Sequence, residues 1–149
     1  MRRRWGWLVL SAMLTTGVHT QNLPMPGKPS DGLEAAKVFD YTSLPVTRNA
    51  NGSERRDIVR SGRLATGEAV HIHASMQPPG TQPNPAHTIT HSEFIVVTQG
   101  TLEISCDGRT ERAGPGSVIY IAYGTMHQAR NVGPGPVQYT VIAIGGDAR

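Results

Sequence analysis

The chain has 149 residues, which is enough for one domain with a hydrophobic core. Its formal charge of +3 comes from Arg2, Arg3 and Arg4. Of the 14 Lys and Arg, the other 11 are balanced by the 11 Asp and Glu. The composition therefore excludes the dense basic surface typical of nucleic-acid-binding proteins, and we expect no nucleic-acid partner.

Residues 1–20 have the pattern of a targeting segment. Three arginines precede the short apolar run "WGWLVLSAMLTTGV", which has fewer than the roughly 20 apolar residues that span a bilayer. We predict a cleaved signal peptide, export to the periplasm or the extracellular space, and no stable membrane anchor. The alternative is an unstructured basic N-terminus on a cytoplasmic protein.

Residues 21–56 are predicted to be a leader and an N-terminal segment rather than part of the main domain. Residues 22–32 are rich in Pro and Gly, and residues 33–45 are predicted to hold a brief helical turn followed by a short strand. The polar stretch from 47 to 56 is predicted to be a loop.

From residue 57 to residue 149 the sequence predicts a single all-β domain. Short apolar runs are separated by Gly, Pro and Asp-Gly, and no run has the 3.6-residue period of an amphipathic helix. Turns are predicted at 99–101 and at Asp107–Gly108, where Asp-Gly favours a tight hairpin. The predicted strand runs are 57–64, 68–76, 93–106 with its internal turn, 109–114, 117–123, 127–132 and 137–144.

The stretch "PAHTITHSEFIVVTQG" carries the residues with the clearest chemistry. His87, Ile89, His91 and Glu93 have the same parity, so they share one face if the segment is extended. Imidazole and carboxylate together suit a first-row divalent metal, with positions left for water or substrate. His127, which follows a later strand and a glycine turn, is the candidate for a further ligand.

In these segments the chain resembles the cupins. The first cupin motif runs Gly, five residues, His-x-His, three or four residues, Glu, six residues, Gly. Gly80 opens it here with one extra residue before His87, and Glu93 is followed by six residues and Gly100. With a three-residue spacer the second motif histidine would fall at Ile89.

The second cupin motif runs Gly, five residues, Pro-x-Gly, two residues, His, three residues, Asn, and Ala122 replaces its Pro here. The resemblance covers about 69–145 and implies an all-β cupin double-stranded β-helix, a jelly-roll-like barrel. It does not imply one function, because this fold has many activities. The positions that fit the second motif are Gly116, Gly124, His127 and Asn131.

By this resemblance, His87, Glu93 and His127 correspond to three of the four metal ligands of the family. Ile89 stands where the fourth would be, and His91 is the candidate to replace it. The implied metal is iron, manganese, zinc, nickel or copper. The alternative is that His91 lies at the surface and that the site is three-coordinate, weak or empty.

Two further features have simpler explanations. His71 and His73 form a His-x-His pair on one strand face, without a carboxylate at motif spacing, so we expect polar lining rather than a metal site. Cys106 is the only cysteine, which excludes an internal disulfide, and nothing beside it predicts an activated thiolate.

Three classes of function remain open: a metal-dependent enzyme such as an oxygenase or isomerase, a non-catalytic module that binds a sugar or another small molecule, and a structural scaffold. No Ser-His-Asp arrangement or phosphate loop is present, and the sequence identifies no catalytic residue. The runs 94–97 and 119–121 are apolar on both faces. Their outer faces need a cover, either residues 38–44 or a second chain, and we predict a homodimer.

Overall fold

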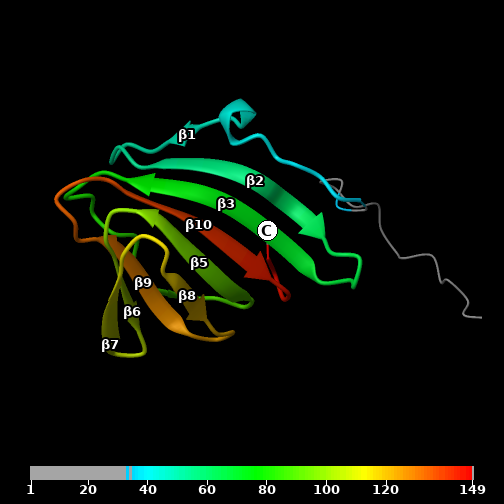
Figure 1. Ribbon diagram of the computed structural model, residues 1–149. Helices are drawn as coiled ribbons and strands as arrows, with labels where there is room; N and C mark the ends of the chain where they lie inside the picture. The colour runs from blue at the N-terminus through cyan, green and yellow to red at the C-terminus, as the bar shows by residue number, and fades with distance from the viewer. Residues whose placement is uncertain (1–32, 34, 149) are drawn as a thin grey trace, which may run out of the picture.

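The computed structural model describes residue 33 and residues 35–148, which form two antiparallel sheets in two layers (Figure 1). The predicted signal peptide and the leader at 22–32 lie outside the described residues. Within the described part, no helix is both long enough and apolar enough to cross a membrane. The all-β prediction is confirmed, since the one helical element among the described residues is a 3-10 turn, η1 (Tyr41–Ser43).

In the described part of the chain, six strands form the larger sheet, in the order β1-β2-β3-β10-β5-β8, and four form the smaller one, in the order β4-β9-β6-β7. The strands are β1 (Thr47–Arg48), β2 (Glu54–Arg63), β3 (Ala69–Gln77), β4 (His87–Thr88), β5 (Ser92–Gln99), β6 (Leu102–Cys106), β7 (Arg109–Ala113), β8 (Val118–Ile121), β9 (Met126–Asn131) and β10 (Val137–Ile144).

The seven predicted strand runs all contain strands, but the N-terminal prediction needs a correction. The helical turn expected within 33–45 is present as η1, whereas the short strand lies later, at Thr47–Arg48, in the stretch predicted to be a loop. This strand pairs with Glu54 and Arg55 at the start of β2. The sheet therefore begins before residue 57, the expected start of the domain.

The hydrophobic core lies between the two sheets, because alternate side chains of each strand point inward. In β10, Val137, Tyr139, Val141 and Ala143 are buried, and the residues between them are less so. This regular alternation is typical of a strand with one face on a core and the other facing outward. The core is completed by Ile89, Ile95, Val97, Leu102, Ile104, Ala113 and Ile121.

The β6–β7 hairpin has the geometry that its Asp-Gly pair predicts. Asp107 and Gly108 both have positive φ, at 47° and 80°, as a primed two-residue turn requires. The turn brings Cys106 opposite Arg109 and fixes the register back to Leu102 opposite Ala113. The local sequence therefore sets which side chains of β6 and β7 face the core.

Asn131 is buried at the end of β9 and stabilises the loop that leads into β10. Its side-chain amide donates to the carbonyl oxygens of Gln77 and Gly135, at 2.9 and 3.0 Å, and its oxygen accepts from the amide of Gly133 at 2.9 Å. The end of the second sequence motif thus supports a turn and does not line the cavity described below.

Candidate functional site

A cavity of about 240 Å³ opens between the inner faces of the two sheets. Strands β2, β3, β5 and β10 supply one wall, and β9 with the segment before β4 supplies the other. The cavity brings together all four predicted metal ligands and several charged or polar residues from the other end of the larger sheet. Its ionisable lining residues other than tyrosine are Arg55, His71, His73, His87, His91, Glu93 and His127.

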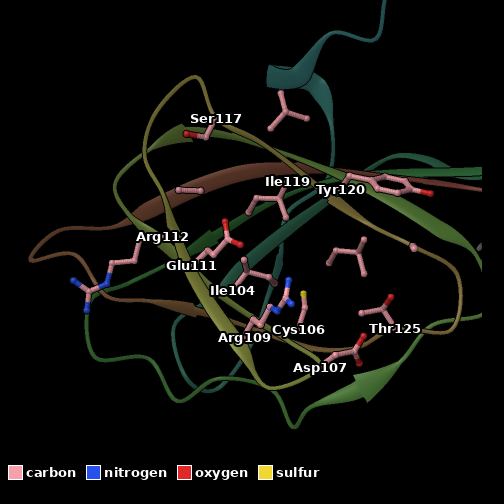
Figure 2. A pocket seen from close by; sticks show the side chains of 14 residues that line it. Ile104, Cys106, Asp107, Arg109, Glu111, Arg112, Ser117, Ile119, Tyr120 and Thr125 are labelled. Carbon is pink, nitrogen blue, oxygen red and sulfur yellow. The ribbon is translucent and has the colours of Figure 1, made fainter.

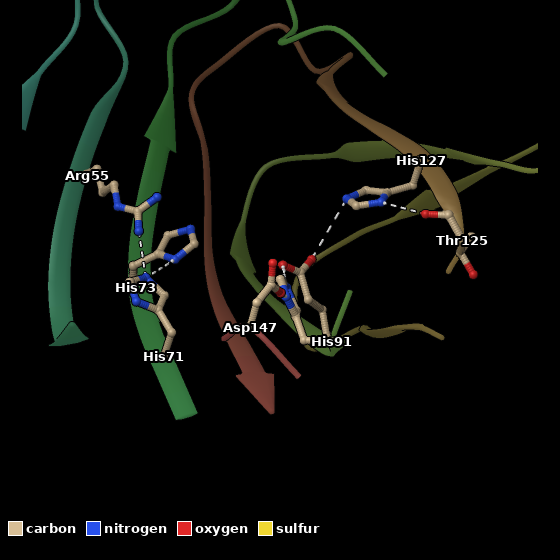
Figure 3. Close-up of polar contacts among 8 residues, drawn as sticks. Arg55, His71, His73, His91, Thr125, His127 and Asp147 are labelled. Carbon is tan, nitrogen blue, oxygen red and sulfur yellow. Dashed lines mark hydrogen bonds and ion pairs between the residues drawn. The ribbon is translucent and has the colours of Figure 1, made fainter. Parts of the chain in front are cut away.

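His91 stands between two carboxylates (Figure 3). Its Nδ1 lies 2.9 Å from Asp147 Oδ1, and its Nε2 lies 2.9 Å from Glu93 Oε1. Burial lowers the pKa of His91, but the hydrogen bonds to Asp147 and Glu93 outweigh burial, and the net pKa is raised. In this arrangement both ring nitrogens donate, and the bond from His91 lowers the pKa of Asp147.

His127 approaches the same carboxylate from the smaller sheet. Its Nε2 lies 3.8 Å from Glu93 Oε2, and its Nδ1 faces the carbonyl oxygen of Thr125 at 3.5 Å. Burial, followed by the neighbouring His87, lowers the pKa of His127, so this ring is neutral at pH 7. Glu93 therefore lies between one imidazole whose pKa is raised and one whose pKa is lowered.

His87 is the most exposed of the four predicted ligands. It pairs with His127 across β4 and β9, and the two ring centroids are 4.5 Å apart. Its Nδ1 lies 3.2 Å from the carbonyl oxygen of Pro85. His87, His91 and His127 thus each have Nδ1 next to an oxygen acceptor, which leaves Nε2 as the nitrogen that a metal would use.

The four residues fit a divalent metal in donor type. Within residue 33 and residues 35–148, however, no group of three or more His, Cys, Asp or Glu side chains is arranged to hold a metal ion. His91 and Glu93 are bonded directly to each other at 2.9 Å, and the proton between them lies where each would face a metal. A metal would have to displace this proton, since the coordinating form of histidine is the neutral ring.

The structure corrects the prediction that residues 87 to 93 point one way as a continuous strand. The chain leaves β4 after Thr88, bends at residues 90 and 91, and enters β5 in the other sheet at Ser92. Ile89, only 5% exposed, packs into the hydrophobic core and does not line the cavity. Ile89 therefore has a packing role, while the bend presents His91 to Glu93.

Two residues that shape this site were not identified in the sequence, Arg55 in the cavity lining and Asp147 behind His91. Asp147 comes from the turn after β10, where its amide donates to the carbonyl of Thr90 at 3.3 Å. Arg55 comes from β2, outside the segment that resembles the cupin motifs. Both lie far from the motifs along the chain, and neither has a local pattern that could have indicated its position.

Gly146 holds the turn that carries Asp147 against the bend beside His91. It has φ +52°, and a Cβ atom added there would collide with the carbonyl group of Thr90. We expect Gly146→Ala to displace Asp147 from His91 and to lower the free energy of unfolding by about 1–3 kcal/mol. Urea unfolding would measure this, with Gly135→Ala as the control, because a Cβ atom at Gly135 meets no atom within 4 Å. Equal stability of the two variants would contradict the expectation.

At the other end of the cavity, His73 is neutral over a wide pH range. Burial, and then the charge of Arg55, lower its pKa from 6.5 to about 3. At a pH between these values, His73 binds a proton when the protein unfolds. The contribution of neutral His73 to the free energy of unfolding is therefore complete above pH 6.5 and is lost progressively as the pH falls toward 3.

We expect the free energy of unfolding to decrease by up to about 1.4 kcal/mol per pH unit below the ordinary histidine pKa because of His73. Urea unfolding between about pH 7 and about pH 5 would show a shallower pH dependence in His73→Leu than in the parent. This range lies above the ordinary pKa values of Asp and Glu, whose titration would otherwise contribute. Parallel curves for the two proteins would contradict the expected role of His73.

A second, larger hollow of about 760 Å³ lies between the β6–β7 hairpin and β8 (Figure 2). Its apolar lining includes Ile104, Ile119 and Ile121, and its lining contains no histidine. Cys106 lines it, but burial and then Asp107 and Glu111 raise the pKa of this thiol. The thiol is therefore protonated at neutral pH and is not an activated nucleophile, in agreement with the sequence analysis.

Comparison with known proteins finds a family model described as "Cupin domain" that matches residues 72–143. No curated protein matches the chain. Solved structures do match, and KdgF from a Halomonas species is similar with a TM-score of 0.61 and 18% identity, over 76% of this chain and 97% of that chain.

Two further structures have the same architecture. The polyketide cyclase RemF from Streptomyces resistomycificus has a TM-score of 0.57 and 18% identity, over 77% of this chain and 87% of that one. A predicted oxalate decarboxylase from Thermotoga maritima has a TM-score of 0.57 and 17% identity, over 72% and 98%. At these identities the similarity shows the fold alone, and it agrees with the double-stranded β-helix expected from the sequence.

Proposed function

Because the chain is a single-domain cupin, we propose that its cavity binds a divalent metal ion through His91, Glu93 and His127, with His87 as a fourth ligand. The observation that carries the proposal is the convergence of two Nε2 atoms on one carboxylate, at 2.9 and 3.8 Å from its two oxygens. Imidazole and carboxylate suit iron, manganese, zinc, nickel and copper. A bound metal of this kind would supply Lewis acidity toward the oxygen atoms of a small molecule.

Around that metal, this chain's own residues would orient the ligands and limit access to the cavity. Asp147 would retain the Nδ1 proton of His91 and so keep Nε2 free for coordination. Two structural neighbours, a polyketide cyclase and a predicted oxalate decarboxylase, are compatible with an enzyme that acts on a small molecule. We propose a metal-dependent activity of the oxygenase or isomerase type.

A non-catalytic cupin that binds a small molecule or sugar without a metal is the second candidate. The observation that favours it is the direct pairing of His91 with Glu93, which satisfies both groups without a metal. In this case the cavity alone provides the binding site, and its charged lining determines the choice of ligand.

Metal analysis separates the two candidates. We expect untagged protein, purified without chelator, to contain close to one equivalent of metal, and His91→Ala and His127→Ala to lose it. His73→Ala is the matched control, because His73 lines the same cavity but is outside the proposed ligand set. The binding module would remain as the function if the parent protein contained no metal and also failed to take up added iron, manganese, zinc, nickel or copper.

We also propose a homodimer that covers the outer face of β5 and β8. Phe94, Val118 and Tyr120 are 38%, 61% and 58% exposed there, and β8 is at the edge of its sheet. Residues 38–44 do not cover this face, because Arg56 on β2 holds them, donating to the carbonyl oxygen of Leu44 at 2.6 Å. We expect sedimentation velocity at micromolar concentration to give the mass of a dimer, and a monomer would refute this.

We also propose that the protein is exported. This proposal depends on the basic and apolar pattern of residues 1–20. Mass spectrometry of protein from the source cell should find a mature chain that lacks about the first twenty residues, and an intact N-terminus in the cytoplasm would contradict export.

A further inference from the structure

Opposite the proposed metal ligands, the cavity has a second polar cluster, formed by Arg55 on β2 and by His71 and His73 on β3 (Figure 3). These three residues line the same cavity as His91 and Glu93. The cavity therefore has two chemically different ends, one with a carboxylate and one with a guanidinium. A molecule that fills the cavity meets both.

The hydrogen bonds of this cluster determine where the imidazole protons lie. His71 Nδ1 is 2.7 Å from the carbonyl oxygen of Arg60, so this nitrogen carries a proton and donates it. His71 Nε2 is then an acceptor, and it lies 2.6 Å from Arg55 Nη2 and 3.2 Å from His73 Nδ1. His73 Nδ1 must therefore donate to it, which leaves a lone pair on His73 Nε2.

His73 Nε2 has no hydrogen-bond partner among the residues that the structure describes. The low pKa of His73, caused by burial and by Arg55, makes its lone pair a weak base and keeps the ring neutral at pH 7. The expected role of this nitrogen is to accept a hydrogen bond from a hydroxyl group, and its low basicity excludes strong general-base catalysis.

Arg55 retains donors for an anionic group. Its Nε donates to Asp57 Oδ1 at 2.8 Å and its Nη2 donates to His71, while Nη1 has no protein partner in the described part of the chain. Asp57 also pairs with Arg60, at 2.9 Å, so two guanidinium groups share one carboxylate. The cluster thus has an excess of one positive charge, which favours a carboxylate ligand.

Gln77 also lines this end of the cavity. Its Nε2 donates to the hydroxyl of Tyr139 at 2.9 Å, whereas its Oε1 is buried without a partner among the described residues. This oxygen is not exposed to the cavity, so a ligand there does not reach it. The Arg55 end therefore offers one cationic donor, the guanidinium of Arg55, and one acceptor, His73 Nε2.

We propose that this end of the cavity binds the carboxylate and hydroxyl groups of a small hydroxycarboxylate, with the carboxylate on Arg55 and the hydroxyl donating to His73 Nε2. The cavity of about 240 Å³ has the volume of roughly eight water molecules, which limits the ligand to a few carbon atoms. This inference rests on the proposed function in that the other end of the same ligand would lie at the metal site.

Calorimetric titration with three four-carbon probes tests the proposal. Malate has both groups, succinate lacks the hydroxyl, and 1,2,4-butanetriol lacks the carboxylates. We expect malate to bind most tightly, and Arg55→Gln to weaken its binding by roughly tenfold to a hundredfold, as for a lost hydrogen bond to a charged group. His73→Leu should weaken malate binding and leave succinate binding unchanged.

The control for charge is Arg48→Gln, because Arg48 pairs with Glu54 and does not line the cavity. Thermal melts would show which variants are folded, and Arg55→Lys provides a milder variant that keeps the charge but loses the planar fork. Equal malate affinity in Arg55→Gln and Arg48→Gln would overturn the proposal, as would a folded parent that binds none of the probes.

Metal content, measured on the same samples, separates this inference from the proposed function. Protein that contains no metal but binds malate through Arg55 would retain the hydroxycarboxylate subsite and refute the metal site. Protein that contains metal but binds malate equally well with and without Arg55 would retain the metal site and refute the hydroxycarboxylate subsite.

Discussion

Replacing Glu93 with alanine is expected to remove the metal from the purified protein and to lower its affinity for added metal by more than about a hundredfold. Glu93 is the carboxylate that His91 and His127 approach, and it contacts them from different oxygens. Without it, His91 loses the partner of Nε2 and keeps only Asp147 on Nδ1. The remaining imidazoles then have no negative charge between them to balance a divalent ion.

Elemental analysis and calorimetric titration with zinc would measure this effect. Glu111→Ala is the matched control, because Glu111 is an exposed glutamate that lines the larger hollow instead of the cavity. Asp147→Asn should have a smaller effect, a loss of about tenfold to a hundredfold, because Asp147 acts on the metal only through the ring of His91. Full metal content in folded Glu93→Ala would refute the proposed ligand set.

The strands could be predicted well because their signals are local. Alternation of apolar residues and the Asp-Gly and Gly-Pro-Gly turns lie within each segment, and the hairpin at Asp107–Gly108 has the φ values that its residues predict. The exposed short strand β1 could not be predicted in this way. It has two residues, neither of them apolar, and it exists because it pairs with β2.

The candidate site was predictable only in part, because its residues come from both sheets. The sequence motifs indicated His87, Glu93 and His127, and the cavity brings them together with His91. The role of Asp147 depends on where the turn after β10 meets the bend at Thr90, which no local pattern specifies. The same holds for Arg55, whose contact with His71 joins residues 16 positions apart on neighbouring strands.

Side-chain parity gave the wrong direction for Ile89 for a specific physical reason. Parity relates residues only within one continuous strand, and here the chain passes from one sheet to the other between Thr88 and Ser92. The bend preserves His91 as a cavity residue, while Ile89 joins the core. The sequence alone therefore could not distinguish a missing ligand from a core position.

Ile89→His is accordingly expected to destabilise the protein and to add no metal affinity. The parent side chain is 5% exposed and packs in the cluster that includes Ile95 and Ile121. Ile89→Ala should lower the free energy of unfolding by about 2–5 kcal/mol, as other large-to-small core changes do. The histidine variant should lose at least about 2 kcal/mol, because it replaces apolar packing with a polar ring that has no partner in the core.

Urea unfolding and zinc titration of the same variants would measure the two effects separately. Val38→Ala is the control for loss of an aliphatic side chain, because Val38 is 90% exposed and lies outside the proposed dimer face, so the change should cost less than about 0.5 kcal/mol. Ile89→Ala separates lost packing from the introduced ring. If Ile89→His were as stable as the parent and bound zinc more tightly, residue 89 would be a ligand position after all, and the core assignment of its side chain would be wrong.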